Sequence, residues 1–454
     1  MNPKMFSINR IFSLCLIFTG MLGSVYAQEE PAKYEFSLLR QEDNLEGMLR
    51  AEDKSRYDRW KVHSLGNDQS LSFGGSIRGQ YEYFDNEEFS FSPNRENGWF
   101  LTRYLLHADL RLKGFRFFGE LGSSLVTGKE DVTPVDRDEL YVNQLFVRFK
   151  VKNATVDIGR ENLKLGSRRL LDPREGPNVR QAFDHVSVRW ESGERGYYIF
   201  GGSPVVPREG IFDNEAFDEE EWLWGAYVTK LLAGDMNLDV YYLGTHYEAI
   251  TYGLGTAEEL RHSIGVRSWG KKGAWQYDNE TVLQLGSFGE SNIFAWTVSF
   301  NVKNQVARSH QLGLKTELIS GTTSENTLGT FNPLYPRGAY FGRVARFGPA
   351  NLIDIHPYWT FRKGKFMMEI DYDVFWRFST DDVIYGPPLN IVLEGTSDQR
   401  FIAQQIGTIF NYEFSPFAML ELETNFIFPG EYIREVRPGA RNLLHLVVTG
   451  ELRF

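Results

Sequence analysis

The sequence predicts an all-β fold, a transmembrane antiparallel β-barrel of about 18 strands with short periplasmic turns and long extracellular loops. Three observations lead to this prediction. Apolar and polar side chains alternate along many segments of roughly 8–15 residues. The connections between these segments are alternately long and short, and the chain ends on one of them. Aromatic residues also make up 15% of the chain, with 35 Phe, 22 Tyr and 43 Gly, which is a composition typical of many strands.

The first residues have the pattern of a secretory signal peptide. Lys4 and Arg10 precede the apolar run 11–25, and Val25-Tyr26-Ala27 fits a cleavage site for a signal peptidase. We therefore predict a signal peptide over residues 1–27, removed on export. Residues 28–70 are expected to form a periplasmic N-terminal extension with room for a short helix, and residues 71–454 the barrel.

The overall charge excludes one class of partner. Acidic residues outnumber basic ones by 60 to 49, and the formal net charge is -11. Such a surface argues against nucleic acid as a partner. No segment after the signal peptide approaches the roughly 20 apolar residues of a membrane-spanning helix.

Alternation with a period of two predicts the strands. It is clearest in Lys365–Phe378, where Phe366 and Met368 share one parity and Glu369 and Asp371 share the other. A barrel in a membrane turns the apolar parity to lipid and the polar parity to its lumen, whereas a soluble sandwich buries the apolar face. The predicted strands are Leu71–Phe84, Trp99–Leu112, Phe115–Thr127, Leu140–Val151, Thr155–Leu163, Phe183–Trp190, Gly196–Pro204, Glu221–Leu231, Asn237–Tyr247, Leu260–Trp269, Trp275–Ser287, Ile293–Val302, Gln311–Ser320, Leu352–Arg362, Lys365–Phe378, Phe401–Phe414, Phe417–Phe428 and Leu443–Phe454.

The lengths of the connections favour the barrel over the sandwich. Every second connection is long: Asp85–Gly98, Gly128–Glu139, Lys164–Ala182, Val205–Glu220, Glu248–Glu259, Gly321–Asn351, Ser379–Arg400 and Pro429–Asn442. Most of the others are tight, such as Lys113-Gly114 and Lys363-Gly364. Two connections depart from the series, because Phe288–Asn292 is short and Asn304–His310 is longer than a tight turn. Long outer loops alternating with short periplasmic turns are typical of outer-membrane barrels, and an even strand count places both chain ends in the periplasm.

The last strand and the aromatic residues indicate two partners. A final strand that ends in Phe454 resembles the signal by which bacterial outer-membrane barrels are assembled, so we expect the barrel-assembly machinery to bind it. Outer-membrane lipid is the second expected partner, contacted by aromatic side chains near the strand ends. These side chains are Tyr81, Tyr83, Trp222, Trp224, Trp359 and Trp376.

Arginines gather between Asp157 and Trp190, in a loop between two predicted strands. They are Arg160, Arg168, Arg169, Arg174, Arg180 and Arg189, interspersed with Glu161, Asp172, Glu175 and Asp184. A guanidinium is a planar fork of donors that suits carboxylates and stays charged near neutral pH. The cluster therefore indicates a surface that binds acidic solutes without catalysing a reaction, and the alternative is a solvated loop.

Strand parity places further arginines in the expected lumen. They are Arg78, Arg103, Arg111, Arg148, Arg189, Arg261, Arg267, Arg362 and Arg377, with Glu82, Asp109, Asp157 and Asp354 as acidic partners. Such a ladder would lower the barrier for a carboxylate-bearing solute, or it would only rigidify a polar inner wall. Arg160 shares the parity of Val156 and Ile158, which would face lipid. Either the strand ends there or a bulge turns the side chain inward, and we expect the strand to end near the rim.

The arginine-rich stretch resembles a known family. GRENLKLGSRRLLDP (159–173) followed by RQAFDHVSV (180–188) is similar to the corresponding segment of the alginate-export family of outer-membrane barrels. EFSLLRQEDN (35–44), LSFGGSIRGQYEYF (71–84) and FNPLYPRGAYFGR (331–343) agree with it. The resemblance implies an eighteen-stranded barrel with an arginine-lined lumen that passes an anionic polysaccharide or a smaller acidic solute. It assigns Arg160, Arg168, Arg169, Arg180 and Asp184 to that lumen.

The function expected from the sequence is an outer-membrane channel for anionic saccharides or other acidic solutes. The residues expected to bind the solute are Arg160, Arg168, Arg169, Arg180, Asp184, Arg189, Arg78, Arg103, Arg148 and Arg362. No catalytic residue, metal site or cofactor is expected, because the sequence has no HExxH, G-x-S-x-G or Gly-rich phosphate motif. A general diffusion porin is the first alternative and an outer-membrane enzyme the second. The loop Gly321–Asn351 is expected either to fold into the pore as a gate or to lie outside it.

Overall fold

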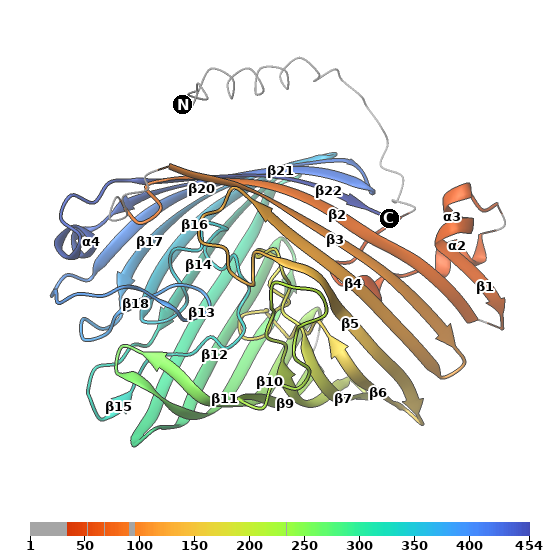
Figure 1. Cartoon of the computed structure of the whole chain (residues 1–454), viewed down its shortest axis with the longest axis horizontal. Coiled ribbons are helices and arrows are strands. Elements are labelled where there is room, and N and C mark those ends of the chain that lie inside the picture. Colours follow the sequence, from red (N-terminus) through yellow and green to blue (C-terminus); the bar gives the residue numbers. More distant parts are fainter. Residues whose placement is uncertain (1–33, 52, 68, 90–95, 233) are drawn as a thin grey trace, which may run out of the picture. The chain divides into compact units, whose positions relative to one another are not determined.

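Eighteen antiparallel strands close into a barrel in the computed structural model (Figure 1). The structure describes residues 34–51, 53–67, 69–89, 96–232 and 234–454. The barrel strands are β2 (Gln69–Asp85), β3 (Glu96–Leu112), β4 (Phe115–Thr127), β5 (Asp138–Val151), β6 (Ala154–Glu161), β7 (Phe183–Ser192), β8 (Arg195–Pro204), β9 (Glu221–Leu231), β10 (Met236–Tyr252), β11 (Gly255–Lys272), β12 (Trp275–Phe288), β13 (Ser291–Ala307), β14 (His310–Ile319), β16 (Leu352–Lys363), β17 (Phe366–Arg377), β20 (Phe401–Ser415), β21 (Ala418–Pro429) and β22 (Leu443–Arg453). The sheet closes because β2 pairs with both β3 and β22. The predicted fold class is confirmed.

The two faces of the barrel have opposite polarity. Outward-facing Leu106 and Phe294 are 58% and 55% exposed, whereas the arginines Arg103 and Arg261 are fully buried inside. A soluble protein would bury the apolar side chains and expose the charges. The alternation therefore produces a surface that lipid can cover and an interior lined with polar groups.

The connections differ in length at the two ends of the barrel, as predicted. One end, called here the short-turn end, carries tight turns such as Lys113-Gly114 and Lys363-Gly364. The other, the long-loop end, carries most of the long connections. The prediction of a long loop over Glu248–Glu259 is wrong, because β10 and β11 remain paired up to Tyr252 and Gly255 across a bulge. The turn expected at Asn304–His310 is also shorter, since β13 continues to Ala307.

The long loops contain small elements that the alternation does not predict. They are β15 (Thr327–Leu328), β18 (Ile384–Tyr385), β19 (Ile391–Leu393) and the helix α4 (Glu431–Val436). Tyr385, Tyr432 and Phe347 are buried among these loops and belong to one apolar cluster with side chains of the barrel strands. No helix in the described ranges is long and apolar enough to cross a bilayer.

Two long loops contact walls of the barrel far from their own strands. The first lumen loop (residues 162–182) joins β6 to β7, and its Asn178 donates to the main-chain oxygens of Thr102 and Leu125, on β3 and β4. The second lumen loop (residues 320–351) joins β14 to β16, and its Arg343 donates to Gln80 of β2. Both loops therefore lie inside the barrel. The second loop therefore lies inside the pore, which is the position expected of a gate, and not outside the barrel.

The residues before the first barrel strand form short elements at the short-turn end. These are η2 (Arg40–Glu42), α2 (Glu46–Arg50), α3 (Arg56–Lys61) and β1 (Val62–Gly66), which pairs with β2. Gln41 accepts a hydrogen bond from inward-facing Arg116 of β4, at 2.7 Å, through its main-chain oxygen. Arg40 and Lys61 both donate to the main-chain oxygen of Phe454, at 3.0 and 3.1 Å. The predicted signal peptide lies outside the described residues.

Removing Arg40 and Lys61 is expected to release the segment 35–61 from the barrel. Each donates a charge-assisted hydrogen bond to Phe454, and such a bond contributes about 1.5–3 kcal/mol. In R40A/K61A we expect a nonspecific protease to cleave between residues 50 and 56 at least roughly tenfold faster, as free energy of this size allows. The barrel itself should keep its heat-modifiable migration on gels. K113A, at an exposed turn, is the control. Equal cleavage rates in the two variants would contradict the contact.

Candidate anion site in the lumen

The candidate site begins with two arginines on neighbouring strands. Arg78 of β2 and Arg103 of β3 stand directly opposite each other in the register, so both side chains point to the same, inner face. They are 3% and 0% exposed. Two guanidinium groups side by side repel each other, so an anion placed between them lowers the electrostatic energy.

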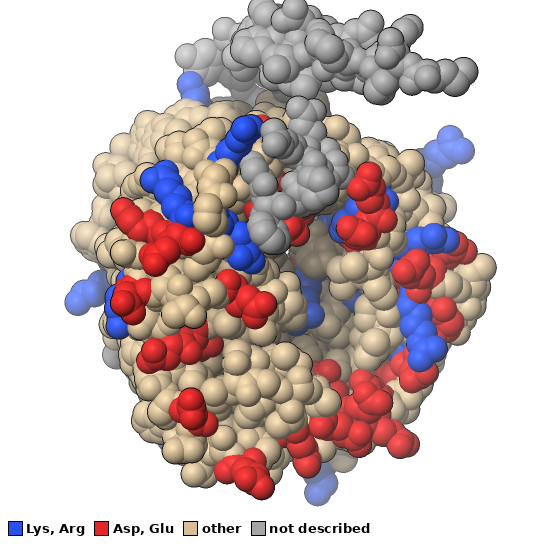
Figure 2. Space-filling view, turned by 60° about the vertical axis from the view of Figure 1, so that its left-hand side comes forward, with Lys and Arg blue, Asp and Glu red and all other residues tan. Residues whose placement is uncertain are grey.

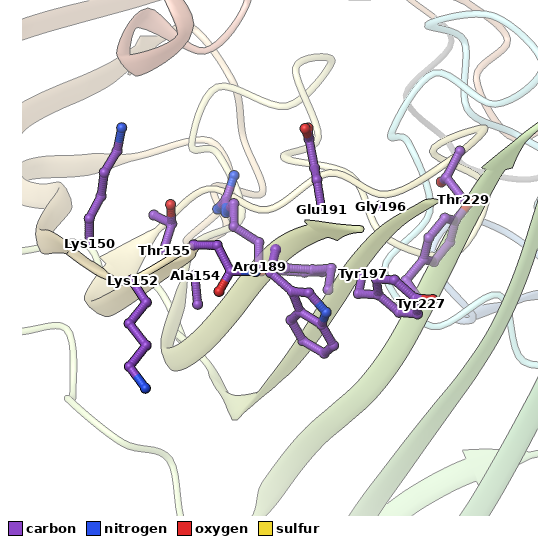
Figure 3. Close-up of a pocket in the computed structure, with 13 residues that line it drawn as sticks. Lys150, Lys152, Ala154, Thr155, Arg189, Glu191, Gly196, Tyr197, Tyr227 and Thr229 are labelled. Atoms are coloured by element: carbon purple, nitrogen blue, oxygen red, sulfur yellow. The ribbon is translucent and has the colours of Figure 1, made fainter. Parts of the chain in front are cut away.

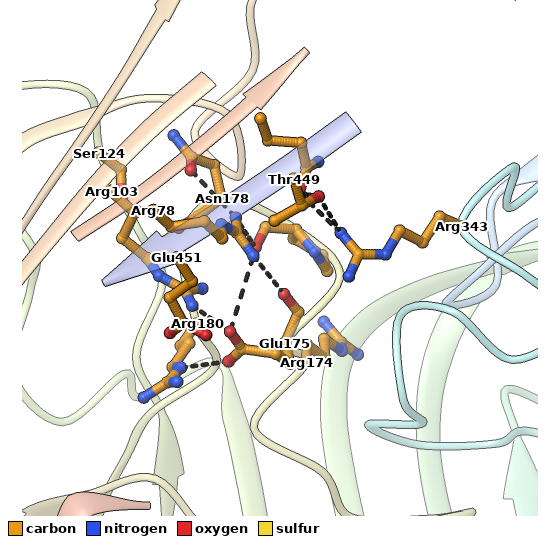
Figure 4. Close-up of polar contacts among 12 residues, drawn as sticks. Arg78, Arg103, Ser124, Arg174, Glu175, Asn178, Arg180, Arg343, Thr449 and Glu451 are labelled. Atoms are coloured by element: carbon orange, nitrogen blue, oxygen red, sulfur yellow. Dashed lines mark hydrogen bonds and ion pairs between the residues drawn. The ribbon is translucent and has the colours of Figure 1, made fainter. Parts of the chain in front are cut away.

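The first lumen loop supplies that anion, as Figure 4 shows. Its Glu175 forms ion pairs with Arg103 and with Arg180, whose Nε lies 2.6 Å from the carboxylate. Arg78 lies 3.7 Å from the same carboxylate and donates to the main-chain oxygens of Glu175 and Pro177, at 2.8 and 3.1 Å. Three arginines therefore converge on one carboxylate.

Asn178 fixes the loop in this position. Its side-chain amide donates to the main-chain oxygens of Thr102, Leu125 and Asp136, and its side-chain oxygen accepts from Arg78 at 3.1 Å. Side-chain amides are well suited to this role, because they satisfy backbone acceptors that would otherwise lack a partner inside the barrel.

The electrostatics of the loop follow from these contacts. Burial alone would raise the pKa of Glu175, but Arg103, Arg180 and Arg78 hold it well below its usual range. Three positive charges at close range outweigh desolvation here. Burial raises the pKa of Asp172 despite its ion pair with Arg168, at 2.7 Å. Glu175 is therefore the strongly ionised carboxylate of the loop.

Two further arginines, one from each lumen loop, contact carboxylates of the wall. Arg169 pairs with Glu280 of β12, at 3.2 Å, and with Glu317 of β14. Arg343 of the second lumen loop binds Glu421 of β21 at 2.6 Å and Thr449 of β22 at 3.0 Å. Both of these loop arginines therefore pair with carboxylates of the wall.

Arg148 and Arg189 lie nearer the short-turn end and share one carboxylate. Asp157 of β6 accepts from Arg148 at 2.6 and 3.0 Å and from Arg189 at 2.6 Å. Arg189 borders a depression of about 570 Å³ that Lys150 and Tyr197 also line, as Figure 3 shows. The side chain of Arg189 is 43% exposed. It is therefore exposed in this structure, whereas Glu175 and the first lumen loop cover Arg78 and Arg103.

Arg160 and Asp184 do not belong to the lumen, although the resemblance assigned them to it. They pair with each other through two hydrogen bonds of 2.8 Å. Arg160 stands opposite Leu145, which is 45% exposed on the outer face, and β6 ends one residue later at Glu161. The register thus turns the pair outward at the rim, where Phe217 donates its main-chain N–H to Asp184 at 3.2 Å. The strand ends near the rim, as expected.

Gly159 helps to place this pair. Its φ is +132°, and a Cβ at this position would lie 2.3 Å from the main-chain oxygen of Leu145. Only glycine adopts this conformation without strain. The glycine therefore lets the backbone of β6 pass close to β5 just before Arg160.

The remaining predicted arginines have structural partners. Arg261 binds Glu259 through two hydrogen bonds of 2.7 and 2.8 Å, and Arg267 binds Asp278 in the same way. Arg377 donates to main-chain oxygens of the loop 378–400, among them that of Gln399. Arg111 pairs with Asp109 at 2.7 Å. These arginines rigidify the wall.

Arg168 and Arg362 are the most exposed of the predicted arginines outside the depression. Strand parity did not indicate three other residues of the site. The Arg168 side chain is 37% exposed, and Arg362 lies exposed near the short-turn end without an ion pair to any described residue. Glu175, Asn178 and Arg343 were not assigned roles. Glu175 is one of the acidic residues of the arginine cluster and Arg343 ends the family segment 331–343, whereas nothing in the sequence indicates Asn178, because loop residues have no parity.

The long-loop end is open to solvent. Figure 2 shows a hollow in this face with basic side chains inside it and acidic side chains scattered over the surrounding surface. An anion that approaches this end meets repulsion at the surface and attraction inside. The arrangement therefore combines basic side chains inside the hollow with an acidic surrounding surface.

Solved structures of outer-membrane proteins from Pseudomonas aeruginosa have the same fold. OccK8 (OprE) matches with a TM-score of 0.57 and 11% identity, covering 85% of this chain and 98% of that protein. OpdK matches with 0.57 and 11%, covering 85% and 99%. OccK2 (OpdF), solved in complex with glucuronate, matches with 0.53 and 11%, covering 84% and 98%.

Sequence comparison identifies the family. A comparison with curated proteins finds no significant match. The family described as Alginate export matches residues 69–445, which is most of the chain and includes both lumen loops. This confirms the resemblance seen in the arginine-rich stretch. The chain belongs to the Alginate export family of outer-membrane channels.

Proposed function

We propose that this outer-membrane channel passes small anionic saccharides of the uronate class, or similar acidic solutes, through its arginine-lined lumen. The observation that carries the proposal is the convergence of Arg78, Arg103 and Arg180 on the Glu175 carboxylate. A uronate carries the same chemical group. A solute carboxylate could therefore exchange with Glu175 without leaving a buried arginine unpaired.

The paired charges also favour release of the solute. Conduction requires that binding be favourable enough for the solute to enter and weak enough for it to leave. Glu175 competes with the solute for the same three arginines, which lowers the net gain on binding. The Asp157 carboxylate between Arg148 and Arg189 acts in the same way nearer the short-turn end.

The comparisons support this choice of solute class. One structural neighbour was solved with glucuronate, and the family is described as Alginate export. Both names refer to uronates. We also propose that the short-turn end and the segment 35–66 face the periplasm, and that Phe454 is the residue bound by the barrel-assembly machinery. The chemistry derived from these residues involves no catalytic step. A general diffusion porin remains the alternative outcome of the tests below.

Neutralising Arg103 is expected to weaken uronate binding in the channel. Planar-bilayer recordings would measure block of single-channel current by oligogalacturonate and by a neutral oligosaccharide of equal length. In R103Q we expect block by the uronate to weaken roughly tenfold, since one charge-assisted contact contributes at least about 1.4 kcal/mol. Block by the neutral sugar should not change.

The matched control for R103Q is R308Q, which removes an equal charge from an exposed turn. It should leave the block by uronate unchanged. Equal block by charged and neutral sugars in the wild-type channel would instead identify a general porin.

Removing the charge of Glu175 is expected to have the opposite effect. E175Q leaves three arginines without their carboxylate, so added uronate should block the current at roughly tenfold lower concentration, and anion selectivity should rise. E215Q, which alters an exposed ion pair with Arg208, is the control. Unchanged selectivity in E175Q would argue against exchange at this carboxylate.

The pH dependence of the wild-type channel follows from the pKa of Glu175. A carboxylate whose pKa is depressed in the folded protein contributes stability at pH values above its unfolded pKa, about 4.3 for Glu. That stability is lost only as the pH falls through the lower, folded value. The current and selectivity of the wild-type channel should therefore show no step from Glu175 between about pH 8 and 4. A step in this range that is absent in E175Q would contradict the assignment.

A further inference from the structure

Three buried groups that the proposed route does not use stand together on the inner wall. Asp354 and His356 are two residues apart on β16, so their side chains share one face, and Asp373 lies on the paired strand β17. They are 1%, 6% and 0% exposed. One ligand atom from each lies within 4.8 Å of those of the other two.

These groups lack the partners that buried charges require. Neither carboxylate oxygen of Asp354 has a hydrogen-bond partner among the described residues, and the same holds for Nε2 of His356. An unpaired buried carboxylate is costly unless it is protonated, paired or bound to a cation. His356 faces Asp373 through Nδ1, and its Nε2 lies 3.9 Å from Asp371.

The neighbouring cations are too few to balance the carboxylates, although the charges of Lys315 and Arg169 act on Asp354. Lys315 stands opposite His356, but its ammonium lies 4.8 Å from the ring of Tyr358. Arg169 pairs with Glu280 and with Glu317, which stands opposite Asp354 and adds another negative charge. Asp373 accepts one hydrogen bond, at 3.2 Å, from the amide of Gln405. Carboxylates therefore exceed available cations at this place.

We propose that Asp354, His356 and Asp373 bind one divalent transition-metal ion of the Zn²⁺ type. Two carboxylate oxygens and one imidazole nitrogen are a common donor set for Zn²⁺, whereas Ca²⁺ and Mg²⁺ take oxygen ligands alone. The ion would neutralise the carboxylates that the protein leaves unpaired.

The second lumen loop covers the site. The ring of Phe341 lies 5.2 Å from that of Phe375, on the same strand as Asp373, and Gln405 joins Asp373 to the main-chain oxygen of Phe341. An ion bound beneath this loop would be shielded from bulk solvent. Its presence would also remove negative charge from the wall beside the anion route, while the route itself does not depend on it.

The test measures Zn²⁺ binding to the full chain, purified from outer membranes in detergent and stripped with a chelator. Equilibrium dialysis against ZnCl₂ is expected to find one tightly bound ion per chain. D354N and H356Q should each weaken this binding at least tenfold. H246Q is the matched control, because His246 pairs with Glu258 at an exposed position and should leave the binding unchanged.

D354N removes an unpaired buried charge, so it should fold, and heat-modifiable migration on gels would verify this. A second measurement needs no variant: Co²⁺ added to the stripped wild-type channel should give visible absorption bands typical of mixed nitrogen and oxygen coordination. Absence of tight Zn²⁺ binding, equal binding in D354N and H356Q, or an all-oxygen Co²⁺ spectrum would each overturn the proposal. In that case the carboxylates share protons instead, and the anion route is unaffected.

Discussion

Pairing between guanidinium groups and carboxylates determines how the interior of this barrel is built. The outer face must be apolar along every strand, so nearly all the charge falls on the inner face, where the two lumen loops exclude much of the water. A buried charge there is tolerated only beside an opposite charge or a set of hydrogen bonds. Arg261 with Glu259, Arg267 with Asp278 and Arg148 with Asp157 satisfy this constraint within the wall. The loops satisfy it across the lumen.

This constraint explains why the site is formed by loops rather than by strands alone. The register fixes Arg78 and Arg103 opposite each other, and their ion pairs are with Glu175 of the loop and not with carboxylates of their own strands. Glu175 contacts them from a loop that lies 97 residues beyond Arg78 and 72 residues beyond Arg103. The position of the loop and the position of the anion site are therefore set by the same ion pairs. A ligand that competes for these arginines also competes with the loop.

The strands could be predicted from the sequence because a period of two must persist wherever one face meets lipid. In β17 the alternation is almost unbroken, and the predicted and observed bounds nearly coincide. Loop contacts have no such period. Nothing in the local pattern around Glu175 or Asn178 shows which wall they meet, and the continued pairing of β10 with β11 beyond Tyr247 is hidden by a bulge. For Arg160, parity indicated the outer face correctly, whereas the resemblance placed the residue inside.

The contacts of Arg40 and Lys61 with Phe454 have a consequence for the order of assembly. The two donors and their acceptor are separated by 414 and 393 residues, and Phe454 also pairs with Gly75 at the junction of the first and last strands. The acceptor reaches its place only when β22 has joined β2. Contacts so distant in sequence form late in folding. The N-terminal segment can thus dock only onto a closed barrel. Its docking stabilises the pairing of β2 with β22, which forms last.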